Sequence, residues 1–546
     1  MRLTLLHDQP LVDHFFHPSG RRGLGAEVTI PAQTSRVLPR RARRIVLAAA
    51  ATVSGLFALD STVISVALPA IRDDLGGGSA TIEWVSSVYL LTFAVTLLPA
   101  GRMVDRYGAR RMFLSGVAVY VAAAFLGALA AAPWMLILGR GAQGVGAGIV
   151  GPSVLVLVTD AFGAERRGWA IGLFGMLLGG FSAAGPLVGG IFTDTVGWQA
   201  IFVVHGVLAA AAAALVARTV PHLAGRARLP LLLGSTAALA GVVLGVQVSI
   251  IEGRRLGWEV GVLFVALAVA SALVLWRRER GRTDRVLDFA MLRIPTVAAS
   301  AIARSVVSFS FYGNLFYLTL FLESSAGYSA FQTGLILLPS SIAGVAVSPF
   351  VGRVVDRTGP GSVMALGTAV AAAGLFALAL ADNDSSVAFH LAPALVLNGL
   401  GYALVSVAAK SAPLGAVPDS QHGRVTSLVS FVSRVASGFG VTFATGVFHL
   451  LSGAGVARAL SDRQLPDASG TADFVRDRIG VGDLQAHLKA AQVKQAGFPD
   501  VPTAVATVDA AFEWIFAGTL FVLGAIVVAG GAAIGLLLLR SRPARP

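Results

Sequence analysis

The stretch GRMVDRYG at residues 101–108 recurs as GRVVDRTG at residues 352–359. Six of the eight positions are identical, and each copy directly follows a long apolar run. The copies begin 251 residues apart, which corresponds to eight membrane spans at roughly 30 residues for a span and its loop. The sequence therefore predicts two related halves of six spans each, separated by an extra pair of spans.

The composition supports a protein that crosses the membrane many times. Hydrophobic residues make up 55% of the 546 residues and charged residues only 13%, against roughly 25% charged residues in soluble domains. An ordinary soluble enzyme is excluded on this ground. Apolar runs long enough to cross a bilayer are predicted near residues 45–70, 81–101, 112–131, 134–158, 168–192, 198–218, 229–250, 257–276, 297–322, 331–351, 362–381, 387–409, 425–450 and 512–539.

This pattern predicts an all-α integral membrane fold of about 14 transmembrane helices, arranged as two six-helix bundles with an inserted helix pair. The predicted parts are a cytoplasmic tail (1–44), a first bundle (45–218), the inserted pair with a basic cytoplasmic loop (219–294), a second bundle (295–540) and a cytoplasmic tail (541–546). A long extracytoplasmic loop with a short amphipathic helix is expected at residues 451–511, inside the second bundle.

The net charge of +13 reflects membrane topology. Arg and Lys collect in alternate short loops, which predicts a multi-pass protein of the cytoplasmic membrane with both termini inside. The short loops between them are acidic or nearly neutral, and only Arg254 and Arg255 run against this trend. The basic residues do not gather on one face, so no nucleic-acid partner is expected.

The chain lacks the residue patterns of several chemistries. It contains no cysteine, which excludes disulfides and thiolate metal sites, and we find no paired metal ligands, nucleophile elbow or nucleotide-binding loop. We therefore expect no enzyme activity, no catalytic residues, no metal and no cofactor.

Three further motifs lie within the first five spans. They are LDSTVISVALP at residues 59–69, RGAQGVGA at residues 140–147 and GPLVGG at residues 185–190. With the repeated loop, these residues resemble the fourteen-span drug:proton antiporter family of the major facilitator superfamily, and the resemblance extends over residues 59–434. It implies two six-helix bundles and the export of lipophilic drugs, since GPLVGG is similar to a motif that marks exporters. Gln199, Ala200 and His205 depart from the family pattern, so the substrate stays open.

The resemblance implies a gating or conformational role for two groups of residues. Glycines allow helix backbones to approach closely, Pro186 supplies a kink, and the charged loop residues can form pairs that close a gate and break when it opens. The alternative for the loops is topological charge on a tight turn. These residues are Gly101, Asp105, Arg106, Gly108, Gly352, Asp356 and Arg357 in the loops, and Gly185, Pro186, Gly189 and Gly190 in the fifth span.

Asp60 and Arg140 are the candidate proton-coupling residues. Counted along their helices, both fall in the outer half of the membrane at a similar depth. Burial favours the neutral acid, whereas a nearby cation favours the carboxylate. We hypothesise that Asp60 binds a proton when the protein is open to the outside, and that the approach of Arg140 or of a cationic substrate releases this proton to the inside. The energy of one such proton supports a roughly hundredfold concentration gradient of the substrate. The alternatives are a hydrogen-bonded structural acid and a snorkelling arginine.

Other residues carry weaker predictions. Gln143 and Arg434 are candidates for substrate binding or gating. His205 is expected to be a hydrogen-bonded packing residue, the alternative being a group that titrates near neutral pH, and Arg304 is expected to snorkel to the cytoplasmic surface. The side chains that would suit planar apolar compounds are Phe309, Phe311, Phe316 and Phe321.

The predicted function is proton-coupled export of small lipophilic drugs, antibiotics or related metabolites. The alternative is a proton-coupled symporter that imports or exports another small metabolite, which an uptake assay would distinguish. The expected partners are a small-molecule substrate, protons and the lipid bilayer, and the protein is expected to be monomeric.

Overall fold

The computed structural model describes residues 39–76, 78–221, 232–282, 285–381, 387–418, 421–465, 469–478 and 490–540. These residues form helices and their connections, and no strand occurs among them. The N-terminal tail, residues 1–38, lies outside the described residues.

The long helices follow the predicted apolar runs closely, because each run is long enough to satisfy its own backbone across the bilayer. The helices are α1 (Arg40–Leu75), α2 (Ser79–Tyr107), α3 (Ala109–Ala128), α4 (Pro133–Thr195), α5 (Gln199–Thr219), α6 (Leu233–Leu256), α7 (Trp258–Glu279), η1 (Phe289–Arg293), α8 (Pro295–Ser324), α9 (Ala330–Thr358), α10 (Pro360–Ala379), α11 (Val387–Ser411), η2 (Leu414–Ala416), α12 (His422–Asp462), α13 (Ser469–Arg478), α15 (Ala490–Gln495) and α16 (Val501–Arg540).

Within the described chain, 13 helical segments are long and apolar enough to cross a membrane, and each coincides with a predicted span. The remaining predicted span, residues 168–192, forms the second part of α4. α4 holds two crossings because it folds back on itself. Its residues Arg140 and Ser182 both bond to the same turn of α1, whereas 42 residues of straight helix would separate them by about 63 Å. The prediction of about 14 spans is therefore consistent with the structure.

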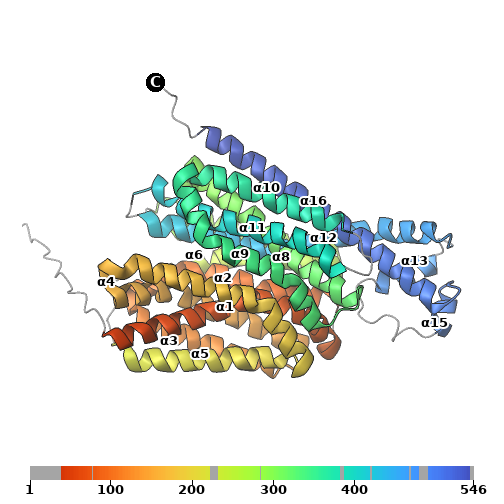
Figure 1. Cartoon of the computed structure of the whole chain (residues 1–546), viewed down its shortest axis with the longest axis horizontal. Helices are drawn as coiled ribbons and strands as arrows, with labels where there is room; N and C mark the ends of the chain where they lie inside the picture. The colour runs from red at the N-terminus through yellow and green to blue at the C-terminus, as the bar shows by residue number, and fades with distance from the viewer. Residues whose placement is uncertain are drawn as a thin grey trace, which may run out of the picture. The chain divides into compact units, whose positions relative to one another are not determined.

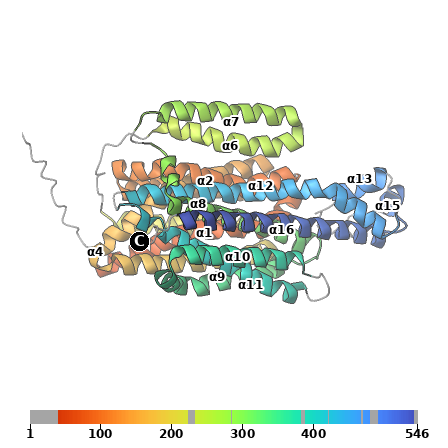
Figure 2. The same ribbon diagram turned by 90° about the horizontal axis from the view of Figure 1, so that it is seen from above.

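The helices pack in two groups and a separate pair. Helices α1–α5 contact one another, and so do α8–α12 with α16 (Figure 1). The two groups meet where α4 contacts α9 and where α2 contacts α12. The inserted helices α6 and α7 lie side by side beyond α2 and α12, and only α6 contacts that pair, as Figure 2 shows.

The repeated loop is helical in both halves, contrary to prediction: it forms the last turns of α2 and α9, and only its final glycine lies beyond each helix. Gly108 ends α2 at φ +87° and Gly359 ends α9 at φ +83°, in the left-handed region that glycine favours. Each glycine donates its N–H to the carbonyl of the valine four residues earlier, Val104 or Val355, at 2.8 and 2.9 Å. The final glycine of each copy is thus explained by the helix end that it forms.

The first glycine of each copy behaves differently from expectation. A Cβ added at Gly101 or Gly352 would meet nothing within 4 Å, so these positions mediate no close helix approach in this conformation.

The segment 451–511 is more helical than the predicted loop. α12 continues to Asp462 and α16 begins at Val501, because Val456, Leu460 and Val508 pack into one apolar cluster. Most of the amphipathic helix expected at residues 483–495 lies outside the described residues, which include only α15 from it.

Candidate transport site

Asp60 and Arg140, the predicted proton-coupling pair, are in direct contact and fully buried. Nη1 of Arg140 lies 2.8 Å from Oδ1 and 2.7 Å from Oδ2 of Asp60. The contact forms because Asp60 in α1 and Arg140 in the first part of α4 sit at the same depth, as counting along the helices predicted. In hydrocarbon, each charge removes much of the cost of burying the other.

The surroundings of the pair hold Arg140 in place. Gln143, one turn along α4, accepts from Nη1 of Arg140 at 3.2 Å, and the carbonyl of Val85 in α2 accepts from Nε at 3.2 Å. The guanidinium also lies 4.4 Å from the ring centre of Tyr89. Arg140 therefore points inward and does not snorkel, and Gln143 contacts the pair itself.

His205 is a member of this site that sequence reasoning assigned to packing. Its Nδ1 lies 3.5 Å from Oδ1 of Asp60 and 3.3 Å from the hydroxyl of Tyr120. The departure of His205 from the family pattern was the one signal for it. The contact itself depends on α5 packing beside α1, which the sequence does not display.

The site contains buried nitrogen atoms without partners. Within the described residues, Nη2 of Arg140, Nε2 of Gln143 and Nε2 of His205 are buried and make no hydrogen bond to protein. A buried polar group without a partner is costly, so such groups mark places where water or a ligand group completes the bonding. Arg140 and Gln143 offer donors to such a group, whereas Nε2 of His205 donates or accepts according to the tautomer of the ring.

A small cavity of about 20 Å³ lies between the two helix groups, next to this site. It has room for about one water molecule. Its wall is mainly apolar, with two buried amides, Asn314 and Asn398, and Oδ1 of Asn314 has no hydrogen-bond partner among the described residues. The lining residues are Thr62, Pro186, Phe311, Asn314, Leu315, Leu337, Ser340, Ser341, Leu395 and Asn398.

The four phenylalanines considered for substrate contact separate into different environments. Only Phe311 lines the cavity, where it stacks near Tyr402. Phe316 and Phe321 are buried in the core of the second helix group, and Phe309 packs against Phe443. Three of the four are therefore packing residues in this conformation.

Two arginines of the second group also point inward. Arg434 of α12 lies over the ring of Phe93 in α2 at 3.7 Å, so it joins the two helix groups. Arg304 bonds to the hydroxyl of Ser406 and lies 5.3 Å from the ring centre of Tyr402. The expectation that Arg304 snorkels is wrong, since α11 offers it a polar and aromatic partner inside the bundle.

The GPLVGG motif packs backbone against backbone. A Cβ at Gly189 would lie 2.7 Å from the carbonyl of Val63 in α1, and one at Gly190 would lie 2.3 Å from the carbonyl of Ala330 in α9. Gly185 similarly abuts Thr62. The motif thus joins α4 to its own group on one side and to α9 of the other group on the other side.

The helix ends predicted to lie outside are closed against each other. The carboxylate of Asp194 in α4 accepts the N–H of Phe331 at 2.8 Å and so caps α9 across the interface between the groups. A carboxylate at a helix N-terminus is favourable because it opposes the positive end of the helix dipole. Toward the other end of α9, Ile342 and Phe350 are 54% and 57% exposed.

A second buried charge cluster joins α6 to both groups. Glu83 of α2, only 1% exposed, pairs with Arg254 of α6 at 2.5 Å, and Arg254 also faces Gly446 of α12. Two turns away along α6, Gln247 donates to Ser87 and Thr442. Sequence analysis missed Glu83, although the unusual outer position of Arg254 and Arg255 was a signal for an acidic partner.

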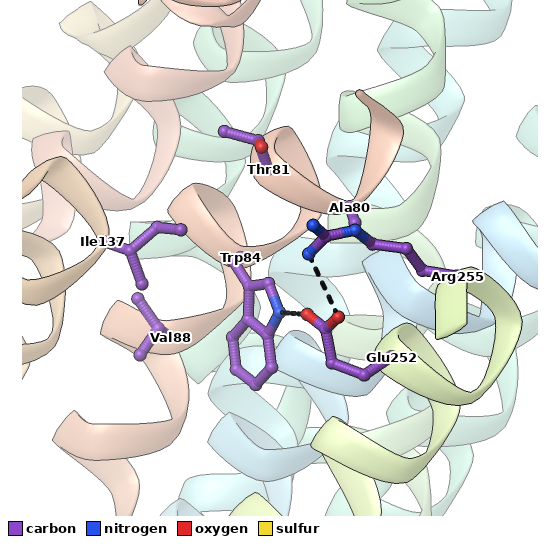
Figure 3. Close-up of a pocket in the computed structure, with 7 residues that line it drawn as sticks. All are labelled: Ala80, Thr81, Trp84, Val88, Ile137, Glu252 and Arg255. Atoms are coloured by element: carbon purple, nitrogen blue, oxygen red, sulfur yellow. Dashed lines mark hydrogen bonds and ion pairs between the residues drawn. The ribbon is translucent and has the colours of Figure 1, made fainter. Parts of the chain in front are cut away.

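Figure 3 shows the more exposed part of this cluster, a pocket of about 260 Å³ between α2, α4 and α6. Glu252 accepts from Nε1 of Trp84 at 2.9 Å and pairs with Arg255 at 3.2 Å. Each of the two outer arginines therefore has its own carboxylate.

The sequence profile described as Major Facilitator Superfamily matches residues 50–441. The chain belongs to the major facilitator superfamily. It is 31% identical to the tetracenomycin C resistance and export protein of Streptomyces glaucescens, over 75% of this chain and 76% of that protein. It is also 33% identical to the multidrug resistance protein Stp of Mycobacterium tuberculosis (71% and 73% covered) and 30% identical to a cephamycin export protein of Amycolatopsis lactamdurans (78% and 88% covered).

Solved structures support the facilitator fold. A bacterial homologue of the human lysosomal transporter Spinster, in an inward-facing and occupied conformation, matches with a TM-score of 0.65 at 16% identity, over 93% of this chain and 100% of that one. An auto-inhibited peptide transporter of the POT family matches with a TM-score of 0.60 at 17% identity, over 93% of this chain and 99% of that one. At such identities the likeness concerns the fold alone.

In this facilitator protein, Gly190→Ala should favour opening of the outer ends. The new methyl group would overlap the backbone of α9, which destabilises the closed arrangement of the outer ends by about 1–3 kcal/mol. The equilibrium between closed and open outer ends then shifts roughly 5–150-fold toward the open form. Since the chain contains no cysteine, spin labels can be placed at Thr195→Cys and Leu335→Cys and their distance measured by electron paramagnetic resonance. Gly180→Ala is the matched control, because a Cβ there meets nothing within 4 Å. Equal distance distributions for the two variants would contradict the assignment.

The buried Glu83–Arg254 pair should contribute far more to stability than the neighbouring Glu252–Arg255 pair. Arg254→Met leaves a buried carboxylate unpaired and should cost about 3–5 kcal/mol, whereas Arg255→Met removes a surface pair worth about 0–1 kcal/mol. The side chains are 27% and 63% exposed, respectively. Thermal unfolding of the two variants in the same detergent gives the comparison, and similar midpoints would show that Glu83 does not need its partner.

Proposed function

We propose that this protein exports small lipophilic drugs or antibiotics, or related metabolites, in exchange for protons. The buried Asp60–Arg140 pair is the observation that carries the proposal, because an ionisable pair inside a membrane bundle marks a proton or substrate pathway. The names of the relatives, which describe antibiotic and multidrug resistance or export, support the substrate class.

The pair offers a physical mechanism for coupling. A proton that binds Asp60 neutralises the carboxylate and leaves Arg140 as an uncompensated charge in a site of low polarity. Arg140 must then find another acceptor or admit water, and either requires α1 and α4 to shift relative to each other. Loss of the proton restores the pair and the original packing, so the two protonation states favour two conformations.

His205 and Gln143 fit this scheme as partners of the pair. His205 contacts the carboxylate that Arg140 also binds, and its free Nε2 can receive or pass on a proton while Tyr120 holds Nδ1. Gln143 holds the guanidinium beside the carboxylate. The substrate enters between the groups, where the cavity beside Thr62 and Asn314 expands as the groups move.

The conformation described is inward-facing in this proposal. Closure by Asp194 and Gly190 seals the outer ends, while Gly101 and Gly352 of the repeated loops face open space. The repeated loops, including Asp105, Arg106, Asp356 and Arg357, then act when the inner ends close. The protein works as a monomer in the cytoplasmic membrane with both termini inside, without a cofactor and without chemistry on its substrate.

Asp60→Asn should abolish uphill export because the side chain can no longer exchange a proton. The test is drug susceptibility of an efflux-deficient bacterium that overproduces the protein, with and without an uncoupler, together with substrate-induced proton release from inverted vesicles. Substrate counterflow down a gradient should persist in the variant, which shows that it is folded and binds substrate. Asp73→Asn, in the same helix but 65% exposed, is the control and should export normally.

Two outcomes would contradict the proposal in different ways. Uncoupler-sensitive export that survives Asp60→Asn at equal protein level would remove Asp60 from the coupling. Accumulation of a small solute in place of its expulsion by the unaltered protein would show a symporter.

A further inference from the structure

A pocket of about 370 Å³ lies at the predicted cytoplasmic end of the inserted pair α6 and α7, away from the transport site. Its walls come from α6, from the end of α7 and from the segment that leads to η1. The residues that line it are Leu239, Ala272, Leu275, Trp276, Glu279, Arg280, Gly281, Arg285, Val286, Leu287 and Phe289.

One wall of the pocket belongs to α7, a helix that is almost entirely exposed, as expected of a span that faces lipid. Ala268 is the one residue of α7 that is buried, and Trp276 near its end is 56% exposed. Trp at the end of a span marks the level of the lipid headgroups. The apolar wall formed by Leu239, Ala272 and Leu275 therefore continues into the acyl-chain region, and the polar rim lies at headgroup level.

Two guanidinium groups stand on this rim. Arg280 lies over the indole of Trp276 at 4.9 Å, which fixes its position, and Nε of Arg285 donates to the carbonyl of Arg282 at 3.0 Å. The remaining N–H groups of these arginines suit a phosphate, because guanidinium forms paired, charge-assisted hydrogen bonds with its oxygens.

Glu279 adds a second requirement to the ligand. Its Oε2 accepts the N–H of Val286 at 2.8 Å, whereas its Oε1 is buried and has no partner among the described residues. A buried carboxylate oxygen requires a donor. A ligand that carried only negative charge would leave this oxygen unsatisfied and be repelled by it.

We propose that this pocket binds a phospholipid whose headgroup carries both a phosphate and a primary ammonium, as phosphatidylethanolamine does. The phosphate binds Arg280 and Arg285, the ammonium donates to Oε1 of Glu279, and the acyl chains follow the apolar wall and α7. A choline headgroup cannot donate a hydrogen bond to Glu279, and a glycerol headgroup has no cation for it.

The wall of this pocket is bonded to the first repeated loop. Nη2 of Arg102, in the first repeated loop, donates to the carbonyl of Arg285 at 2.7 Å. The pocket wall and the end of α2 are therefore joined, so lipid occupancy affects the loop that the proposed function assigns to inner closure. The lipid site itself stands whether or not the substrate is a drug.

The test is native mass spectrometry of the purified full-length protein with equimolar phosphatidylethanolamine, phosphatidylcholine and phosphatidylglycerol of identical chains. We expect phosphatidylethanolamine to be retained about tenfold over phosphatidylcholine, the effect of one hydrogen bond to a charged group. Glu279→Gln should remove this preference, since Gln still accepts from Val286 but no longer attracts an ammonium. Arg280→Gln with Arg285→Gln should weaken all three lipids by about tenfold or more.

Arg293→Gln is the matched control, because Arg293 ends η1 near the pocket without lining it, and its lipid preference should equal that of the unaltered protein. An unchanged preference in Glu279→Gln would overturn the proposal, and so would stronger retention of phosphatidylglycerol. Displacement of the lipid by soluble phosphoethanolamine at equal concentration would show that the site binds the headgroup without the acyl chains. Displacement by a lipophilic drug would show that the pocket is a substrate entry site. Either result would also overturn the proposal.

Discussion

A charged side chain in hydrocarbon needs a partner, and the first helix group is built around one such pair. Asp60 and Arg140 are fully buried and bonded at 2.7 Å, and helices α2 and α5 supply the groups that surround them. Because neither charge is tolerable alone, α1 and the first part of α4 are held at one relative depth. Protonation of Asp60, or any other change that neutralises its carboxylate, therefore removes the attraction that holds α1 and α4 at this relative depth. In the proposed mechanism, structural constraint and proton sensitivity therefore have the same origin.

Close backbone packing transmits such a change to the other half. The GPLVGG segment places Gly185 and Gly189 against α1, within one or two turns of Asp60, and Gly190 against α9. A shift of α1 therefore displaces the surface that α9 rests on. Packed interfaces have few stable arrangements, so a small local change is resolved by a rocking of one group against the other. The cap that Asp194 provides to α9 adds a polar contact to the same interface.

The sequence predicted most of the fold and the centre of the site, for identifiable reasons. Spans follow from apolar length, the halves from the repeated loop, and the Asp60–Arg140 contact from depth along helices of opposite direction. What it did not predict depends on which helix faces are neighbours. His205 reaches Asp60 only because α5 packs beside α1, and Arg304 turns inward because α11 offers Ser406. Glu83 was overlooked because it lies near the outer end of its span, where a solvated acid is the ordinary expectation.

The inserted pair α6 and α7 is attached to the two helix groups through α6. α7 buries almost nothing, so α6 attaches the pair. It does so through polar contacts, Glu83 with Arg254 and Gln247 with Ser87 and Thr442, and through Leu239 and Val243, which pack in an apolar cluster with residues of α2 and α12. In lipid, apolar surfaces gain little from meeting each other, whereas buried charges and hydrogen bonds are specific in partner and direction. Ser87 belongs to α2 and Thr442 to α12, the helices by which the two groups meet. The side chain of Gln247 thus bonds to both groups at their interface. In the proposed transport cycle, α6 exchanges at least one of these bonds when the outer ends separate.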